Sequence, residues 1–201
     1  DYTSGRADES NGTVGVFRLP PIDPSSSDEV TAVRVGNALK GTDNEHFGIS
    51  LAIAADAGAT PSNGGLVQIA VGSSRYNVGD GYHHGRVSVW EYNSEAVDEA
   101  DAWSSSQVEV LFGSANFSNF GISVDLSADG RRLAVGASGQ AFDGNLRAGV
   151  VHLFEYCEGE WEPMGTRAGT SSDDRKGISL ALSRDGTRMA VGAPFADNAD
   201  E

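Results

Sequence analysis

The chain has 201 residues, of which 39% are hydrophobic, and it contains 26 glycines and six prolines. This composition supports a globular core and excludes a disordered chain. The formal net charge of −15 argues against a nucleic-acid partner, because phosphate binding needs clustered Lys and Arg. There is no run of eighteen apolar residues and no signal-peptide pattern, so we expect no direct membrane insertion.

The N-terminal part predicts two extended segments. Residues 12–19 predict a strand, and a weaker strand is expected at 30–41. Residues 20–29 lie between them and contain three prolines, which remove backbone donors, so this stretch predicts an extended connector.

The middle of the chain predicts one unit of strands twice. The first copy has strands at 47–54, 68–72 and 85–92, with a weaker fourth strand at 103–113. The second copy is cleaner, because Ile122, Val124 and Leu126 alternate with polar residues as in a half-buried strand. Its strands are expected at 120–126, 133–136, 149–156 and 161–169, of which the last is the sparsest in apolar residues.

A tight turn joins the first two strands of the second copy. Residues 127–130 read Ser-Ala-Asp-Gly, in which short polar side chains can bond the backbone and Gly130 accepts a positive φ. Residues 177–194 repeat this strand-turn-strand pattern almost residue for residue, and the chain ends before a third strand.

A four-stranded antiparallel unit repeated along a chain is the signature of a β-propeller blade. The fold class expected is therefore all-β, a propeller of four-stranded antiparallel blades. Because closed propellers typically need four or more blades, about three blades indicate part of a larger propeller. The expected blades are a blade end at 12–41, full blades at 47–113 and 120–169, and a partial blade at 177–201.

The repeated order of Phe-Gly, Val-Gly-Ala-Pro and Gly-x-Val-x-Val-Phe resembles the FG-GAP repeat, known best from integrin α-subunit propellers. The resemblance covers nearly the whole chain. The sequence departs from the pattern at Lys176, which replaces the Phe of the third copy, and at residues 72–74 and 136–138, which replace Gly-Ala-Pro. The resemblance implies a non-enzymatic extracellular protein that binds other proteins in adhesion or surface assembly.

Some family members bind calcium in a first-hairpin loop of the form Asp-x-Asp-x-Asp-Gly-x-x-Asp. The corresponding turns here have one central carboxylate each, Asp129 and Asp185, with a basic residue where the last acid belongs. The longer loop at 56–65 offers only Asp56 and Asn63. Since calcium needs several oxygen ligands, we expect no calcium, no other metal and no cofactor.

Other candidate chemistry is sparse. His83 and His84 are adjacent, but neighbouring residues of an extended strand point to opposite faces, so a polar loop is favoured over a metal site. His152 is expected to pack between blades with a hydrogen-bonded ring rather than act as a base. Cys157 is the single cysteine, so a disulfide framework is excluded and an unpaired thiol is expected. No catalytic residues are predicted.

Two Asn-x-Ser/Thr triplets, at Asn11 and Asn116, are candidate glycosylation sites. Together with the resemblance, they favour an extracellular or secretory-lumen location, including the cell surface.

The leading function hypothesis is an interaction scaffold, in which the loops between second and third strands and the loops between blades gather on one face. Its partner is expected to be a protein, glycosylated or not, and the chain is expected to belong to a longer chain or larger assembly. Two alternatives remain: a structural subunit of a larger complex, and a propeller enzyme or carbohydrate-binding module with active residues outside this segment. The expected contact residues are Arg75, Asp80, Tyr82, Asp143 and Arg147.

Overall fold

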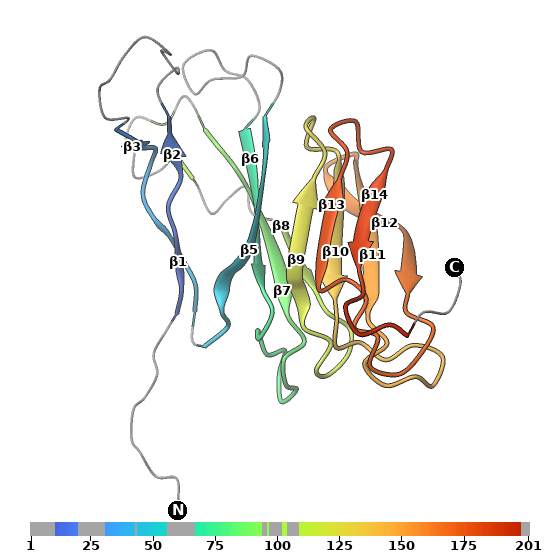
Figure 1. Cartoon of the computed structure of the whole chain (residues 1–201). Coiled ribbons are helices and arrows are strands. Elements are labelled where there is room, and N and C mark those ends of the chain that lie inside the picture. The colour runs from blue at the N-terminus through green and yellow to red at the C-terminus, as the bar shows by residue number, and fades with distance from the viewer. Residues whose placement is uncertain are drawn as a thin grey trace, which may run out of the picture.

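A computed structural model describes residues 11–19, 31–42, 44–55, 67–93, 96, 102–103 and 109–197. These residues form strands, turns and loops and contain no helix (Figure 1). All strand pairs are antiparallel. The all-β, antiparallel prediction is therefore confirmed, while the described part of the chain does not close into a ring.

Two four-stranded sheets have the same strand order. In each, strands that are consecutive in sequence lie side by side, and the register is continuous except for bulges near residues 47–50, 136–137 and 153–154. The first sheet contains β5 (Phe47–Ala55), β6 (Val67–Ser73), β7 (Arg86–Glu91) and β8 (Glu109–Phe112). The second contains β9 (Phe120–Leu126), β10 (Arg132–Ala137), β11 (Val150–Cys157) and β12 (Glu160–Ala168).

Partial sheets stand at both ends of the described chain. The N-terminal strands pair as β1 with β4 and β2 with β3, so the segments predicted at 12–19 and 30–41 do lie against each other. At the C-terminal end β13 pairs with β14, as the repeat predicted. Their bounds are β1 (Thr13–Val14), β2 (Phe17–Arg18), β3 (Val33–Arg34), β4 (Leu39–Lys40), β13 (Ser179–Leu182) and β14 (Met189–Gly192).

Several expected segments fall outside the described residues. These are the proline-rich connector at 20–29, the loop at 56–65, most of the first half of the strand expected at 103–113, and the last residues of the partial blade, 198–201.

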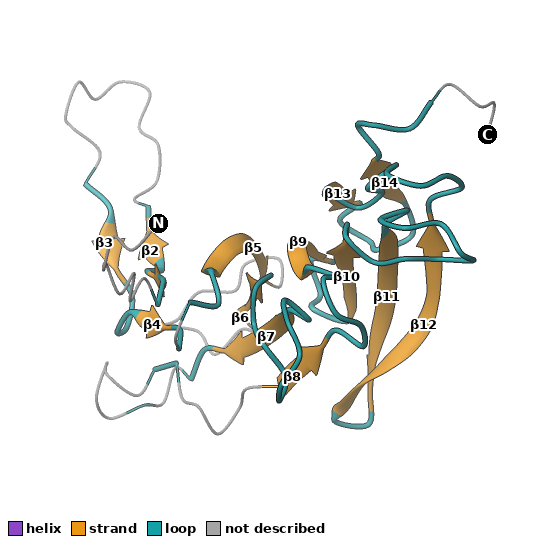
Figure 2. Cartoon of the chain, turned by 90° about the horizontal axis from the view of Figure 1, so that it is seen from below, coloured by secondary structure: helices purple, strands orange, loops and turns teal. Residues whose placement is uncertain are grey.

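The core lies between the sheets. The residues of β5–β7 that face β9 and β10 form one apolar cluster with them, and the other face of β6 packs with Val14, Leu39 and Trp103 in a second cluster. Figure 2 shows the sheets following one another in chain order, with β5, β9 and β13 adjacent along one side.

One contact between sheets recurs and explains two of the sequence motifs. The Ser50 hydroxyl donates to the Gly121 carbonyl oxygen (2.8 Å), and the Ser123 hydroxyl donates to the Gly177 carbonyl oxygen (2.7 Å). A Cβ at Gly136 would stand 2.1 Å from the Gly177 oxygen, so that position must be glycine for the sheets to approach. The repeated Gly-Ile-Ser and Val-Gly motifs therefore encode sheet-to-sheet packing.

The face of β5 turned toward the N-terminal partial sheet is open. Ile49, Leu51 and Ile53 are exposed, although the corresponding residues of β9, Val124 and Leu126, are buried against the first sheet. An apolar stripe of this kind on a sheet normally lies against another layer.

Candidate functional site

Four loops project from the same end of the sheets, and we call this end the loop face (Figure 1). They join β6 to β7, β8 to β9, β10 to β11 and β12 to β13, at residues 74–85, 113–119, 138–149 and 169–178.

Backbone hydrogen bonds tie these loops to one another in pairs. The Phe117 N–H donates to the Tyr82 carbonyl oxygen (2.8 Å), and the Arg175 N–H donates to the Arg147 carbonyl oxygen (3.1 Å). The Gly139 N–H also donates to the Ser118 carbonyl oxygen (3.0 Å), which joins the second loop to the third. Each loop is thus fixed by its neighbours as well as by its own strands.

A buried polar side chain anchors each connection that leads into the first strand of a sheet, namely β5, β9 or β13. Glu45, Ser118 and Asp174 each stand two residues before the Phe-Gly or Lys-Gly pair, and each is almost completely buried. The Ser118 hydroxyl donates to the His84 carbonyl oxygen (2.6 Å), while Asp174 Oδ2 accepts from the Thr170 and Ser171 N–H groups. Sequence reasoning missed these anchors, although a polar residue at this place in every copy was a visible signal.

The Glu45 anchor carries a buried ion pair. Its carboxylate lies 2.6 Å from Arg86 Nε and also accepts from Arg86 Nη2 (2.7 Å) and from the Thr42 N–H (2.6 Å). The Arg86 guanidinium lies 4.3 Å from the centre of the Tyr76 ring. This pair therefore joins β7 to the connection before β5. The hydrogen bonds go to Glu45 Oε1, whereas Glu45 Oε2 and Arg86 Nε form an ion pair at 2.6 Å and have no hydrogen-bond partner among the described residues.

All five predicted contact residues are exposed on the loop face, in two groups. Arg75, Asp80 and Tyr82 belong to the β6–β7 loop, and Asp143 and Arg147 belong to the β10–β11 loop.

The two groups contact different neighbours. Tyr82 stacks on Phe117, with ring centres 6.1 Å apart and ring planes 7° apart. Arg147 forms an exposed ion pair with Asp173, and this hydrogen bond lowers the pKa of the Asp173 carboxyl and raises the pKa of Arg147. Phe117 was not predicted as a contact residue. The only sequence signal near it was the glycosylation triplet Asn116-Phe117-Ser118, of which it is the middle residue.

Within the described part of the chain, His83 and His84 do not come together with a third metal-ligating side chain. His83 has a positive φ of 48°, so the extended geometry assumed from the sequence was wrong, and its ring meets Phe117 edge-on. Its pKa is lowered by burial and by the charge of Arg75. Among the described residues, no three His, Cys, Asp or Glu side chains come together in a way that could hold a metal ion.

His152 has a hydrogen-bonded ring and lies on the face of its sheet that packs against the first four-stranded sheet, as predicted. Its Nε2 lies 2.8 Å from Gln140 Oε1, and its ring contacts Phe120 and Phe154 of its own sheet. Burial lowers the pKa of His152. Its neighbour on β10 is Val135, and Val135 and Phe120 belong to the apolar cluster between the two four-stranded sheets, against which Phe154 also packs.

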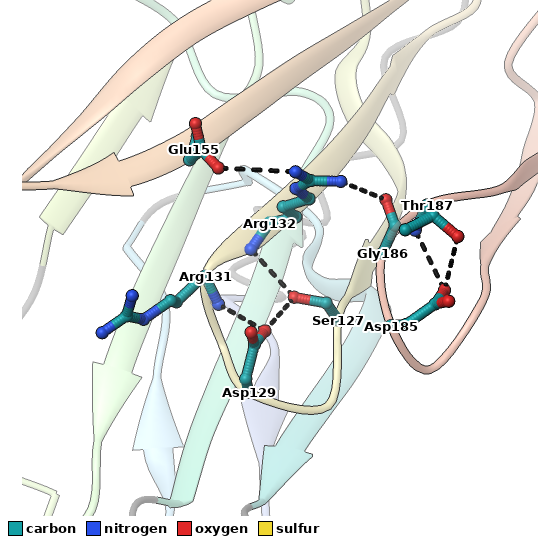
Figure 3. Close-up of polar contacts among 8 residues, drawn as sticks. All are labelled: Ser127, Asp129, Arg131, Arg132, Glu155, Asp185, Gly186 and Thr187. Atoms are coloured by element: carbon teal, nitrogen blue, oxygen red, sulfur yellow. Dashed lines mark hydrogen bonds and ion pairs between the residues drawn. The ribbon is translucent and has the colours of Figure 1, made fainter.

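The two hairpin turns use their carboxylates internally (Figure 3). Asp129 accepts from the Ser127 hydroxyl and the Arg131 N–H, and Asp185 accepts from the Ser183 hydroxyl and both donors of Thr187. These hydrogen bonds lower the pKa of Asp129 and lower that of Asp185 to about 2. Each turn therefore has one carboxylate, and its Oδ1 accepts all of these hydrogen bonds.

An open cavity of about 780 Å³ lies at the opposite end, by the β11–β12 turn. Cys157 carries an exposed thiol. The cavity brings this thiol together with charged side chains but no histidine that could activate it. It is lined by Arg131, Tyr156, Cys157, Glu158, Glu160 and Glu162.

The two glycosylation candidates differ in environment. Asn116 is exposed, and its Oδ1 accepts from the Tyr82 N–H (2.9 Å). Asn11 is half-buried, with an Oδ1 that has no partner within the described residues.

A scan against protein-family models gave no match for this chain, and a search of curated proteins gave none. In the part of the chain that the structure describes, no helix is long and apolar enough to cross a membrane.

Proposed function

We propose that the chain is a segment of a larger β-propeller made of FG-GAP-like repeats. Two features support the proposal. The first is a hydrogen bond that occurs twice with nearly the same length, as stacked repeats require: a serine in the first strand of one sheet, Ser50 or Ser123, donates to the carbonyl oxygen of the glycine in the Phe-Gly or Lys-Gly pair of the next sheet. The open apolar face of β5 and the two-stranded β13–β14 sheet are the surfaces that further blades of the same kind would cover. The proposed blades span 12–41, 47–113, 120–169 and 177–201.

Its proposed role is that of a non-enzymatic interaction scaffold in the extracellular space or the secretory lumen, including the cell surface. The observation that carries this proposal is the loop face, where backbone hydrogen bonds hold exposed side chains from several loops in fixed positions. Rigid presentation lowers the entropy that a binding surface loses on association. The proposed partner is a protein, and the proposed contacts are Arg75, Asp80, Tyr82, Asp143 and Arg147.

The test compares two variants of the immobilised chain in capturing proteins from the extracellular fraction of the source cells. The loop-face variant replaces Arg75, Tyr82 and Asp143 by Ala, and the control variant replaces Glu158 and Arg184, which are exposed at the opposite end. We expect a partner that the wild-type chain and the control retain and the loop-face variant loses. Equal retention by all three proteins would contradict the proposal.

A structural-subunit role is the second candidate, and the open face of β5 favours it. In that case the bound protein would cover Ile49, Leu51 and Ile53 rather than the loops, and the loop-face variant would retain it.

Location has its own test. Expression through a eukaryotic secretory pathway, followed by enzymatic removal of N-linked sugars, should lower the mass of the chain if Asn11 or Asn116 is modified. An unchanged mass would remove glycosylation as support for this location.

A further inference from the structure

An exposed aromatic pair stands on the loop face. The rings of Tyr82 and Phe117 are nearly parallel, and the two side chains are 61% and 57% exposed. His83 supports the pair from the side, because its ring meets Phe117 edge-on at 5.8 Å. Most of this aromatic surface therefore stays in contact with solvent instead of joining the core.

Phe117 is held in a backbone conformation that phenylalanine rarely adopts. Its φ is +58°, and the residues at the same place in the other two connections are Asn44 (φ +49°) and Asp173 (φ +68°). Asn and Asp tolerate this left-handed region, whereas a bulky residue there costs on the order of 1 kcal/mol or more. Since an exposed ring gains little from burial, the strain favours a role for Phe117 at the surface.

Two side-chain amides lie beside the pair with their oxygens fixed. Asn116 Oδ1 accepts from the Tyr82 N–H (2.9 Å), and Asn77 Oδ1 accepts from the His83 N–H (2.8 Å). Neither amide nitrogen has a hydrogen-bond partner within the described residues. Each Nδ2 therefore remains available as an oriented, uncharged donor next to the rings.

The four loops are together close to neutral, although the whole chain carries −15. The four loops and residues 193–197 contain five acidic and four basic residues. The charged residues are Asp80, Asp143, Asp173, Asp174 and Asp197, and Arg75, Arg147, Arg175 and Lys176. An uncharged ligand suits this surface better than an ion does.

We propose that Tyr82 and Phe117, with the amides of Asn77 and Asn116, bind the ring of a neutral pyranose sugar. The negative face of an aromatic ring attracts the polarised C–H groups on the apolar side of a sugar, and the sugar hydroxyls accept hydrogen bonds from the two Nδ2 groups. A mostly apolar surface with a few fixed polar groups is the usual composition of a small-molecule site. This inference deepens the proposed interaction role and rests on it, because the sugar would belong to a glycosylated partner.

Saturation-transfer difference NMR tests the inference with the methyl glycosides of glucose, galactose, mannose and N-acetylglucosamine. The whole chain is expressed in bacteria, so that Asn116 carries no N-linked glycan that would occupy the proposed sugar site. We expect transfer to at least one sugar, with the strongest signals from protons on one side of the ring. Glucuronic acid, which is anionic, should bind more weakly to this acidic chain.

The decisive variant is Phe117→Asn, which introduces a residue type found at the equivalent positions. It should weaken sugar binding by about tenfold or more, the range for loss of one stacking ring. It should leave the melting temperature unchanged or raised, since the strain is relieved. Phe142→Asn, in the β10–β11 loop, is the matched control and should keep full binding.

Three outcomes would overturn the inference: transfer to none of the sugars, full binding by Phe117→Asn, or binding only of an apolar peptide probe such as acetyl-Leu-Phe-amide. If a protein partner still needs the loop face in these cases, the scaffold role stands and the sugar site alone is wrong. If sugar binds but no partner needs the loop face, the scaffold role is wrong instead.

Discussion

Gly136→Ala is the substitution that most directly probes the packing between sheets. The added Cβ would stand 2.1 Å from the Gly177 carbonyl oxygen and 2.3 Å from Ser123 Oγ, so β10 and the Gly177 backbone must move apart. Overpacking of this kind costs about 1–3 kcal/mol. Loss of the hydrogen bond from Ser123 to Gly177 adds about 1 kcal/mol. We therefore expect a loss of about 2–4 kcal/mol in the free energy of unfolding.

Gly192→Ala provides the matched control at the same position of the next copy. There the added Cβ would meet only the Ser179 side chain at close range, with the hydroxyl at 2.3 Å and the remaining atoms at 3.6 Å. That hydroxyl can rotate away, so we expect a change under about 1 kcal/mol. Urea unfolding followed by circular dichroism measures both. Equal losses in the two variants, or no loss in Gly136→Ala, would refute the reasoning.

Three further predictions concern charge and burial. The pKa of Asp185 is about 2 in the folded chain against an ordinary 3.8, so the ionised carboxylate stabilises the fold above about pH 4 and loses this effect toward pH 2. The melting temperature of the wild type should therefore exceed that of Asp185→Asn by less as the pH falls over that range. Glu45→Gln should lower the free energy of unfolding, measured with urea, by about 3–5 kcal/mol. Glu155→Gln removes a partner from an exposed ion pair and should lower it by under about 1 kcal/mol. Equal losses would contradict the argument that burial makes the first pair more important. Val124→Ser should lower the free energy of unfolding by about 2–3 kcal/mol, and Leu51→Ser should lower it by under about 1 kcal/mol. Comparable losses in the two variants would mean that the β5 face is already covered.

The strands and turns were predictable because they depend on local patterns. Alternating apolar residues located β9, and the Ser-x-Asp-Gly signature located the turns, in which Gly130 and Gly186 do have positive φ. The strand β12 shows the limit of this approach, because it has few apolar residues and yet spans nine residues. Its backbone pairs along the whole of β11, and hydrogen bonding rather than burial defines it.

The candidate site was predictable only in part. Loops between second and third strands were expected to carry the contacts, and Tyr82 was named among them. Phe117 and the Glu45 anchor were missed because their roles come from residues distant in sequence: Phe117 stacks on a ring 35 positions earlier, and Glu45 pairs with Arg86 across the unit. The repeated polar residue marks the position of the anchor, but a single sequence does not show that Glu45 pairs with Arg86 or that Phe117 stacks on Tyr82.

Backbone hydrogen bonds between neighbouring loops explain how the loop face is held in place without a helix. The N–H groups of Asn119 and Phe120 donate to the carbonyl oxygens of His83 and His84, and Lys176 repeats this contact with Ala148 one unit later. Positive φ values at these turns are thus supported by neighbouring backbone rather than by glycine alone.

Site-specific photo-crosslinking tests the central claim that the loop face is the binding surface. A photoreactive phenylalanine analogue replaces Phe142 on the loop face in one protein and Arg184 at the opposite end in another, and both residues are exposed. After irradiation with the extracellular fraction of the source cells, we predict a defined crosslinked partner from position 142 and none from position 184. Crosslinks from position 184 alone, or the same partner from both positions, would contradict the account.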